Sequence, residues 1–182
     1  MAQPERETYR HGDLKAEAVR IGIELLEASG ADAISMRKIA TSAGVTHRAL
    51  YRHFGDRNAL LRTIAAAGFD QMAERLSGIT GRVGFLKAYV RFAIDKPNLY
   101  ALMMSRTNSE FNSNDELGKS VSAVITLSKR ALSPKDAGKK GDLAVIRIWM
   151  LLHGGITLNQ NGVLAPRSPD ELVAMLVDFA ER

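Results

Sequence analysis

The chain has 182 residues, of which 46% are hydrophobic and 25% are charged, and it contains no cysteine. This length is enough for one compact domain or two small ones with a substantial buried core. The absence of cysteine excludes disulfides, thiolate metal sites and cysteine nucleophiles, and it fits a reducing compartment.

Neither a membrane span nor a signal peptide is apparent in the sequence. No uninterrupted apolar run approaches the roughly 18–20 residues that cross a bilayer. The first eleven residues are polar and charged, without the apolar stretch of a secretory signal. We therefore expect a cytoplasmic protein with no membrane partner.

The net charge of +5 is concentrated in one window. Between Ser35 and Arg62 there are six cations and a single anion, Asp56, so this window alone equals the excess of the whole chain. The six cations are Arg37, Lys38, Arg48, Arg52, Arg57 and Arg62. Such a cluster favours a nucleic-acid partner but does not by itself demonstrate one.

The first predicted element is an amphipathic helix. Apolar residues recur there at steps of four and three, which lines one helical face: Leu14, Ala18, Ile21, Leu25 and Ala28. Gly30 is well placed to end this helix.

Two short helices are predicted next. Ser35 is a suitable N-cap for a helix of two to three turns, which Gly44 ends. Thr46 is a suitable N-cap for a second short helix that runs through Phe54. Asp56 then caps a longer helix.

The rest of the chain also shows helical periodicity. After a break at Gly78 and Gly81, a helix is predicted with Val83, Leu86, Val90 and Ala93 on its inner face, and Pro97 begins another. Further helices are predicted from about 115 to 132, over 143–158, and after Ser168, whose pattern with Glu171 is that of a capping box. Residues 107–114 and 133–141 are predicted connections. Nothing alternates with the period of a strand, so the predicted fold class is all-α.

Two short helices joined at a glycine are what a helix-turn-helix requires. The second helix of that motif enters the major groove, and its outer face must then be polar. Here that face presents Thr46, His47, Arg48, Tyr51 and Arg52. Arginine bonds guanine edges, and the other side chains reach phosphates or bases. Taken alone, the pattern is equally typical of the solvated face of a surface helix.

The segments Ser35–Ala40, Ala43–Thr46, Ala49–Phe54 and Asp56–Leu61 resemble the amino-terminal domain of TetR-family transcriptional regulators. This resemblance implies a three-helix helix-turn-helix domain over residues 9–58. It also implies a larger helical bundle over residues 59–182 that binds an effector and serves dimerisation. The helix from about residue 56 would link the two.

The same resemblance implies which residues meet DNA. Ser35 and Thr46 would cap the two short helices, and Gly44 would make the turn between them. Arg57 stands where the family usually has lysine at a phosphate contact, and Arg48 stands where many members carry a small residue. The full set of candidate DNA contacts is Ser35, Arg37, Thr46, His47, Arg48, Tyr51, Arg52, His53 and Arg57.

The carboxy-terminal half shows a looser match. The segments Trp149–Gly154 and Pro97–Met104 resemble a TetR subgroup noted for a Trp, His and Gly (WHG) in this region. Candidate ligand contacts are Phe92, Tyr100, Met103, Met104, Trp149 and His153. The alternative is that Met and aromatic residues at this spacing are plain core. Gly154 and Gly155 are also suited to a close approach of two helices, as a packed subunit interface would favour.

The leading functional hypothesis is a DNA-binding transcriptional regulator. The resemblance implies a ligand-responsive repressor with an unknown small-molecule effector, which binds an inverted-repeat operator on double-stranded DNA as a homodimer through its carboxy-terminal helices. One alternative is a constitutive DNA-binding or architectural protein with no effector.

The other alternative is an enzyme, and the sequence opposes it. No His-Glu pair has metal-ligand spacing, no glycine-rich phosphate loop precedes a helix, and no Gly-x-Ser-x-Gly occurs. We expect no catalytic residues, no metal site and no cofactor.

Overall fold

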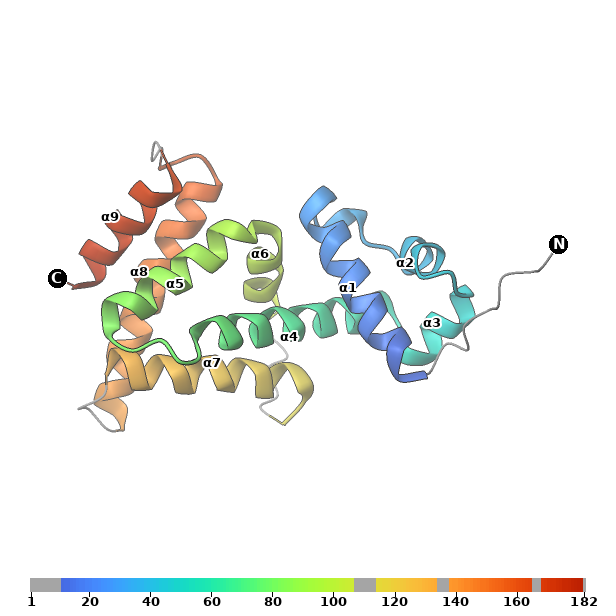
Figure 1. Cartoon of the computed structure of the whole chain (residues 1–182), viewed down its shortest axis with the longest axis horizontal. Coiled ribbons are helices and arrows are strands. Elements are labelled where there is room, and N and C mark those ends of the chain that lie inside the picture. The colour runs from blue at the N-terminus through green and yellow to red at the C-terminus, as the bar shows by residue number, and fades with distance from the viewer. Residues whose placement is uncertain (1–10, 107–113, 134–137, 165–167, 182) are drawn as a thin grey trace. The chain divides into compact units, whose positions relative to one another are not determined.

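The computed structural model describes residues 11–106, 114–133, 138–164 and 168–181. All regular structure in these residues is helical, which confirms the predicted fold class. In chain order the elements are α1 (His11–Ser29), the single-turn 3-10 helix η1 (Ala31–Ala33), α2 (Met36–Ser42), α3 (His47–Phe54), α4 (Arg57–Leu76), α5 (Arg82–Asp95), α6 (Pro97–Ser105), α7 (Glu116–Leu132), α8 (Lys139–Gln160) and α9 (Pro169–Glu181) (Figure 1).

The described residues form two compact units, and the boundary between them falls inside α4. Residues up to Ile64 form the amino-terminal unit, and residues from Ala65 onward form the carboxy-terminal unit. Each unit has its own buried apolar core.

The amino-terminal unit is built on α1, which packs against η1, α2 and α3. The predicted inner face of α1 is confirmed at its start, but its end differs. Leu26 is fully buried, whereas Leu25 is half-buried and Ala28 is exposed. The buried face of α1 instead reaches Leu26 in steps of four through Gly22. Ile64 of α4 packs closely against Gly22, so that a Cβ on this glycine would lie 2.5 Å from Cδ1 of Ile64.

The predicted caps of the short helices are confirmed. Ser35 Oγ accepts a hydrogen bond from Lys38 N at 3.1 Å, and Thr46 Oγ1 accepts one from Ala49 N at 3.2 Å. The turn between α2 and α3 passes through Gly44 at φ +64°, which a residue with a Cβ rarely adopts. These contacts satisfy backbone amides that helix starts leave free.

The carboxy-terminal unit is a helical bundle in which α5 packs most extensively against α9, and α8 packs against both α7 and α9. Pro97 begins α6, Asp115 Oδ1 caps α7 through Gly118 N at 2.7 Å, and Ser168 Oγ caps α9 through Glu171 N at 3.2 Å. Most of the two predicted connections, residues 107–113 and 134–137, lie outside the described residues.

Helix α8 is unusually apolar. Over Gly141–Gln160 it is long and apolar enough to cross a membrane by length and composition alone. A core helix of a soluble protein passes the same test, and α8 carries Asp142 and Arg147 and packs between neighbouring helices. We therefore describe α8 as a bundle helix.

Candidate DNA interface and ligand cavity

Helix α3 has one buried and one exposed face. Leu50 and Phe54 are buried in the amino-terminal unit. The opposite side, here called the α3 outer face, comprises the exposed residues Thr46, His47, Arg48, Tyr51 and Arg52. The structure thus brings together on one short helix the five residues that sequence reasoning selected there.

Positive charge on α2 and α3 is left uncompensated. Arg37 and Lys38 on α2, and Arg48 and Arg52 on α3, are exposed and form no ion pair with any residue that the structure describes. Some arginines elsewhere are paired, as Arg75 is with Asp95 at 2.8 Å. An exposed, unpaired cationic surface is the electrostatic property that attracts a phosphate backbone.

Two rings order part of the α3 outer face. His47 and Tyr51 meet edge-on, with ring centroids 4.7 Å apart and planes at 76°. Such an arrangement restricts both side chains before any partner arrives. The neighbouring His53 is half-buried rather than exposed and interacts within the chain.

Arg57 forms two side-chain hydrogen bonds to backbone carbonyls within the amino-terminal unit. Its Nε donates to the carbonyl of Ile34 at 2.8 Å, and a terminal nitrogen donates to the carbonyl of Ala31 at 2.7 Å. The guanidinium therefore ties the start of α4 to η1 and the residue after it. Sequence reasoning assigned Arg57 a phosphate contact and did not foresee this role, because no spacing pattern signals a bond between residues 23 and 26 positions apart.

The carboxy-terminal unit contains an apolar cavity of about 300 Å³. Its wall is formed by side chains of α4, α5, α6, α7 and α8: Phe69, Tyr89, Met104, Val121, Val124, Ile146, Trp149, Met150 and His153. Three candidate ligand contacts, Met104, Trp149 and His153, are among them. The other three, Phe92, Tyr100 and Met103, do not line the cavity and are buried in the core.

Sequence reasoning missed the remaining lining residues. The valines of α7 and the exposed Ile146 and Met150 of α8 are ordinary apolar residues at helical spacing. They differ from other apolar residues only in that they border a space between several helices. The periodicity of a single helix does not predict where such a space lies.

A chain of long hydrogen bonds joins two residues of the cavity wall, Tyr89 and His153, through the buried Tyr100. The hydroxyls of Tyr89 and Tyr100 lie 3.4 Å apart, and the Tyr100 hydroxyl lies 3.3 Å from Nδ1 of His153. Burial raises the pKa of Tyr89 and of Tyr100 above the usual value of a phenol. Both hydroxyls therefore keep their protons at neutral pH.

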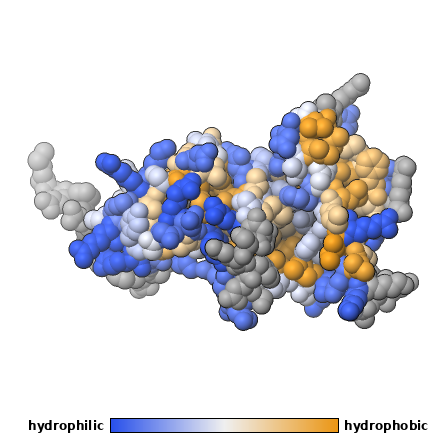
Figure 2. All heavy atoms as spheres, turned by 180° about the vertical axis from the view of Figure 1, so that it is seen from behind, coloured by the Kyte–Doolittle hydropathy of each residue, from blue (hydrophilic) through white to orange (hydrophobic). Residues whose placement is uncertain are grey.

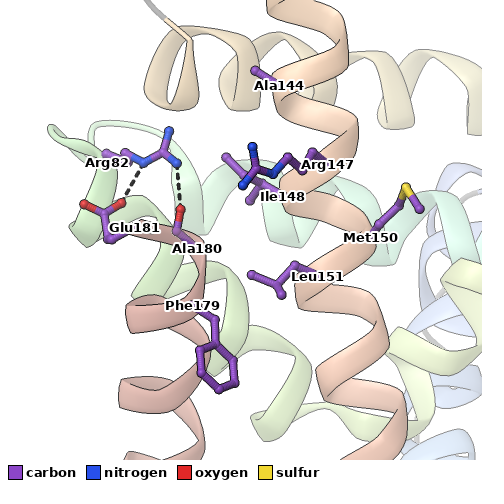
Figure 3. Close-up of a pocket in the computed structure, with 9 residues that line it drawn as sticks. All are labelled: Arg82, Ala144, Arg147, Ile148, Met150, Leu151, Phe179, Ala180 and Glu181. Atoms are coloured by element: carbon purple, nitrogen blue, oxygen red, sulfur yellow. Dashed lines mark hydrogen bonds and ion pairs between the residues drawn. The ribbon is translucent and has the colours of Figure 1, made fainter.

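A second hollow, of about 520 Å³, lies between α8 and α9 (Figure 3). Arg82 stands at its rim and donates to Glu181 Oε1 at 2.6 Å, to the carbonyl of Ala180 at 2.8 Å and to that of Leu132 at 2.8 Å. Val83, which was expected on the inner face of α5, is 41% exposed.

Helix α8 carries a row of exposed apolar residues, here called the α8 apolar face: Leu143, Ile146 and Met150. They lie at positions i, i+3 and i+7, so they share one side of the helix. Figure 3 shows Met150 projecting from α8 away from α9. Hydrophobic side chains also gather at the surface of the carboxy-terminal unit in Figure 2. A contiguous apolar surface of this kind is typical of a protein–protein contact.

In the described ranges of the chain, no cluster of acidic or histidine side chains suggests a metal. Within the residues that the structure describes, no group of three such side chains is close enough to hold an ion.

The two units match two models of one protein family. Residues 20–64 match bacterial regulatory proteins of the tetR family, and residues 83–180 match the tetracyclin repressor-like C-terminal domain. A helix-turn-helix unit followed by a helical bundle defines the class as a helix-turn-helix transcriptional regulator. More particularly, the chain belongs to the TetR family. This is a family of DNA-binding regulators and not of enzymes.

Solved structures share the fold over nearly the whole chain. A protein with unknown function from Rhodococcus sp. RHA1 is 26% identical, with a TM-score of 0.78 and coverage of 96% of this chain and 97% of that one. A TetR transcriptional regulator from the same organism is 20% identical, with a TM-score of 0.67 and coverage of 92% and 94%.

A third solved structure contains a bound ligand. It is a variant of TetR from Acinetobacter baumannii AYE in complex with minocycline, which is 20% identical, with a TM-score of 0.64 and coverage of 92% of each chain. No curated protein matches the chain.

Proposed function

We propose that this chain is a ligand-responsive repressor that acts in the cytoplasm and binds an inverted-repeat operator as a homodimer. The observation that carries the DNA-binding part is the α3 outer face, where Arg48 and Arg52 lie exposed on a capped helix and form no ion pair within the described part of the chain. Arginines in this position read base edges in the major groove.

The homodimer is supported by the α8 apolar face. A two-fold axis would bring the same surface of two chains together, which buries these side chains at once in both. It would also present two copies of α3 to successive turns of the duplex, so half-sites would lie about one helical turn, or a multiple of it, apart.

Ligand responsiveness is supported by the apolar cavity, whose volume lies at the lower end of the roughly 300–1,000 Å³ usual for small-molecule sites. An effector that binds one conformation more tightly shifts the protein toward it, and only by its difference in affinity. Assignment to the WHG subgroup stays a prediction, consistent with the position of Trp149 and His153 on the cavity wall.

The proposal is tested by selecting bound sequences from a random duplex pool with the purified protein. We expect an inverted repeat to emerge and its binding to weaken steeply with salt. Arg48→Ala and Arg52→Ala are expected to relax base preference. Arg37 lies on α2, the first helix of the motif, which crosses the DNA backbone, so Arg37→Ala is expected to weaken binding to all duplexes alike. Absence of any preferred duplex at low ionic strength would refute the DNA-binding assignment.

A further inference from the structure

The polar groups on the cavity wall are few, and two of them lie on α8. Trp149 and His153 are one helical turn apart and both line the cavity. Trp149 Nε1 is buried and has no hydrogen-bond partner in the described part of the chain. A buried N–H without an acceptor carries an uncompensated desolvation cost, so a ligand that supplies the acceptor gains affinity there.

The proton position on His153 follows from the two tyrosines. Among the residues that the structure describes, the buried Tyr89 hydroxyl has one hydrogen-bond partner, the Tyr100 hydroxyl. If His153 donated into this chain, the proton of Tyr89 would be left buried without an acceptor. The satisfied arrangement therefore runs the other way: Tyr89 donates to Tyr100, and Tyr100 donates to Nδ1 of His153.

This direction determines what His153 offers to a ligand. In a neutral imidazole one ring nitrogen accepts and the other donates. Because Nδ1 accepts from Tyr100, Nε2 carries the proton. Trp149 and His153 are thus both donors, and the Tyr89 hydroxyl is already engaged within the chain.

The cavity wall also lacks formal charge. None of its lining residues is Lys, Arg, Asp or Glu, and apart from Tyr89, Trp149 and His153 they offer only carbon and sulfur atoms. A buried carboxylate or ammonium requires an opposite charge or several hydrogen bonds to offset its desolvation. The complement of this wall is an uncharged ligand that accepts hydrogen bonds.

We propose that the cavity binds an uncharged, largely apolar molecule with a hydrogen-bond acceptor, such as the carbonyl of a ketone, ester or lactone, which accepts from Trp149 Nε1. This inference rests on the proposed ligand-responsive function, since it specifies the ligand of the same cavity. The acceptor meets the unpaired indole N–H, while the hydrocarbon part fills the space between the valines of α7 and Phe69.

Three probes of one skeleton test the inference: dicyclohexyl ketone, dicyclohexylmethane and dicyclohexylacetate. Their dissociation constants are measured by calorimetry and by the fluorescence of Trp149, the sole tryptophan of the chain. We expect the ketone to bind about tenfold more tightly than the hydrocarbon, which corresponds to one buried hydrogen bond, and the anion to bind most weakly. Equal binding of ketone and hydrocarbon, or tightest binding of the anion, would overturn the inference and leave the cavity as a ligand site.

The variant Trp149→Phe removes the N–H and keeps a ring. By calorimetry it is expected to weaken ketone binding about tenfold and to leave hydrocarbon binding unchanged. A loss of affinity for both probes in equal measure contradicts a specific hydrogen bond. If no probe binds the wild type, the inference fails together with the ligand-responsive part of the proposed function, while selection from the duplex pool tests DNA binding separately.

A measurement on the wild-type protein tests the inference even if the Trp149→Phe variant does not fold. Nitrogen NMR of ¹⁵N-labelled histidine distinguishes the two neutral tautomers of His153. We expect the proton on Nε2, and a proton on Nδ1 would overturn the assigned direction of the hydrogen-bond chain and with it the donor character of His153.

Discussion

Arg57 joins the start of α4 to η1 through two hydrogen bonds from one guanidinium group. Lysine keeps the positive charge but lacks the planar fork that reaches two carbonyls. At this position the stability of the amino-terminal unit and the capacity to bind a phosphate therefore depend on different properties of the same side chain.

We expect Arg57→Lys to lower the free energy of unfolding by about 1–3 kcal/mol, because at least one carbonyl loses its charged donor. Urea unfolding measures this change. The control is Arg37→Lys, since Arg37 is exposed and unpaired in the described residues, and its effect is expected to stay within about 0.5 kcal/mol. Equal stability of the two variants would contradict the structural role of Arg57.

The buried tyrosines make stability depend on alkaline pH. Their pKa values are raised by burial in the folded state, so the unfolded chain releases these protons first. Stability is then fully present below about pH 10, the ordinary pKa of tyrosine, and is lost as pH rises beyond it.

We expect the unfolding free energy to fall above about pH 10 by about 1.4 kcal/mol per pH unit for each buried tyrosine. Tyr89→Phe removes one of the two contributions and is expected to make the decline shallower by that amount. Urea titrations at a series of alkaline pH values measure the slope, and an unchanged slope in Tyr89→Phe would show that its ionisation is not linked to unfolding.

At the scale of elements, Gly155 allows α8 and α9 to approach closely. A Cβ at Gly155 would lie 2.2 Å from Cδ2 of Leu176, a buried residue of α9. A Cβ at the adjacent Gly154 meets nothing within 4 Å. Gly155 alone of the glycine pair thus allows a close approach of two helices within the chain, whereas a subunit contact at this pair stays a prediction.

The two glycines form a matched pair of variants. Gly155→Ala is expected to destabilise by about 1–3 kcal/mol because Leu176 and α9 must shift. Gly154→Ala is expected to stabilise by about 0.5–1 kcal/mol through higher helix propensity. Thermal and urea unfolding of both variants give the comparison, and the opposite order of stability would mean that the packing of α8 on α9 is wrong.

Local signals predicted the elements well, because a cap or a turn is a bond between near neighbours. Ser35, Thr46, Asp56 and Ser168 all accept the expected amide. Periodicity also predicted which side of most helices is buried. It did not predict packing depth, as at Leu26, since that depends on which residue of another helix lies opposite.

The residues of the α3 outer face were predicted from the sequence more completely than those of the cavity. The α3 outer face lies on one helix, so spacing alone assembled it. The cavity is a gap among five helices, and only three of its six sequence-predicted residues line it. Phe92, Tyr100 and Met103 are residue types that are common in ligand sites, but in the structure their side chains are buried in the core.

For the whole molecule, the exposed residues of α8 predict self-association. Leu143 is 66% exposed on the α8 apolar face and lines neither cavity. We expect Leu143→Glu to convert a dimer to a monomer in sedimentation equilibrium, because a carboxylate would be buried in both chains at a two-fold contact.

The matched control is Val83→Glu, which changes an exposed valine of α5 that is not part of the α8 apolar face. It is expected to leave the dimer intact. A Leu143→Glu variant that stays dimeric, or a Val83→Glu variant that dissociates, would place the contact elsewhere.

The three bonds of Arg82 have a consequence for synthesis. They join the start of α5 to residues 50, 98 and 99 positions later, at the ends of α7 and α9. On the ribosome the helix-turn-helix unit can fold early, because its hydrogen bonds join residues that are near one another in the sequence. The bundle can complete its packing only after the last turn of α9 has left the exit tunnel. Nascent chains halted before Ala180 would therefore hold a folded helix-turn-helix unit attached to an incompletely packed bundle.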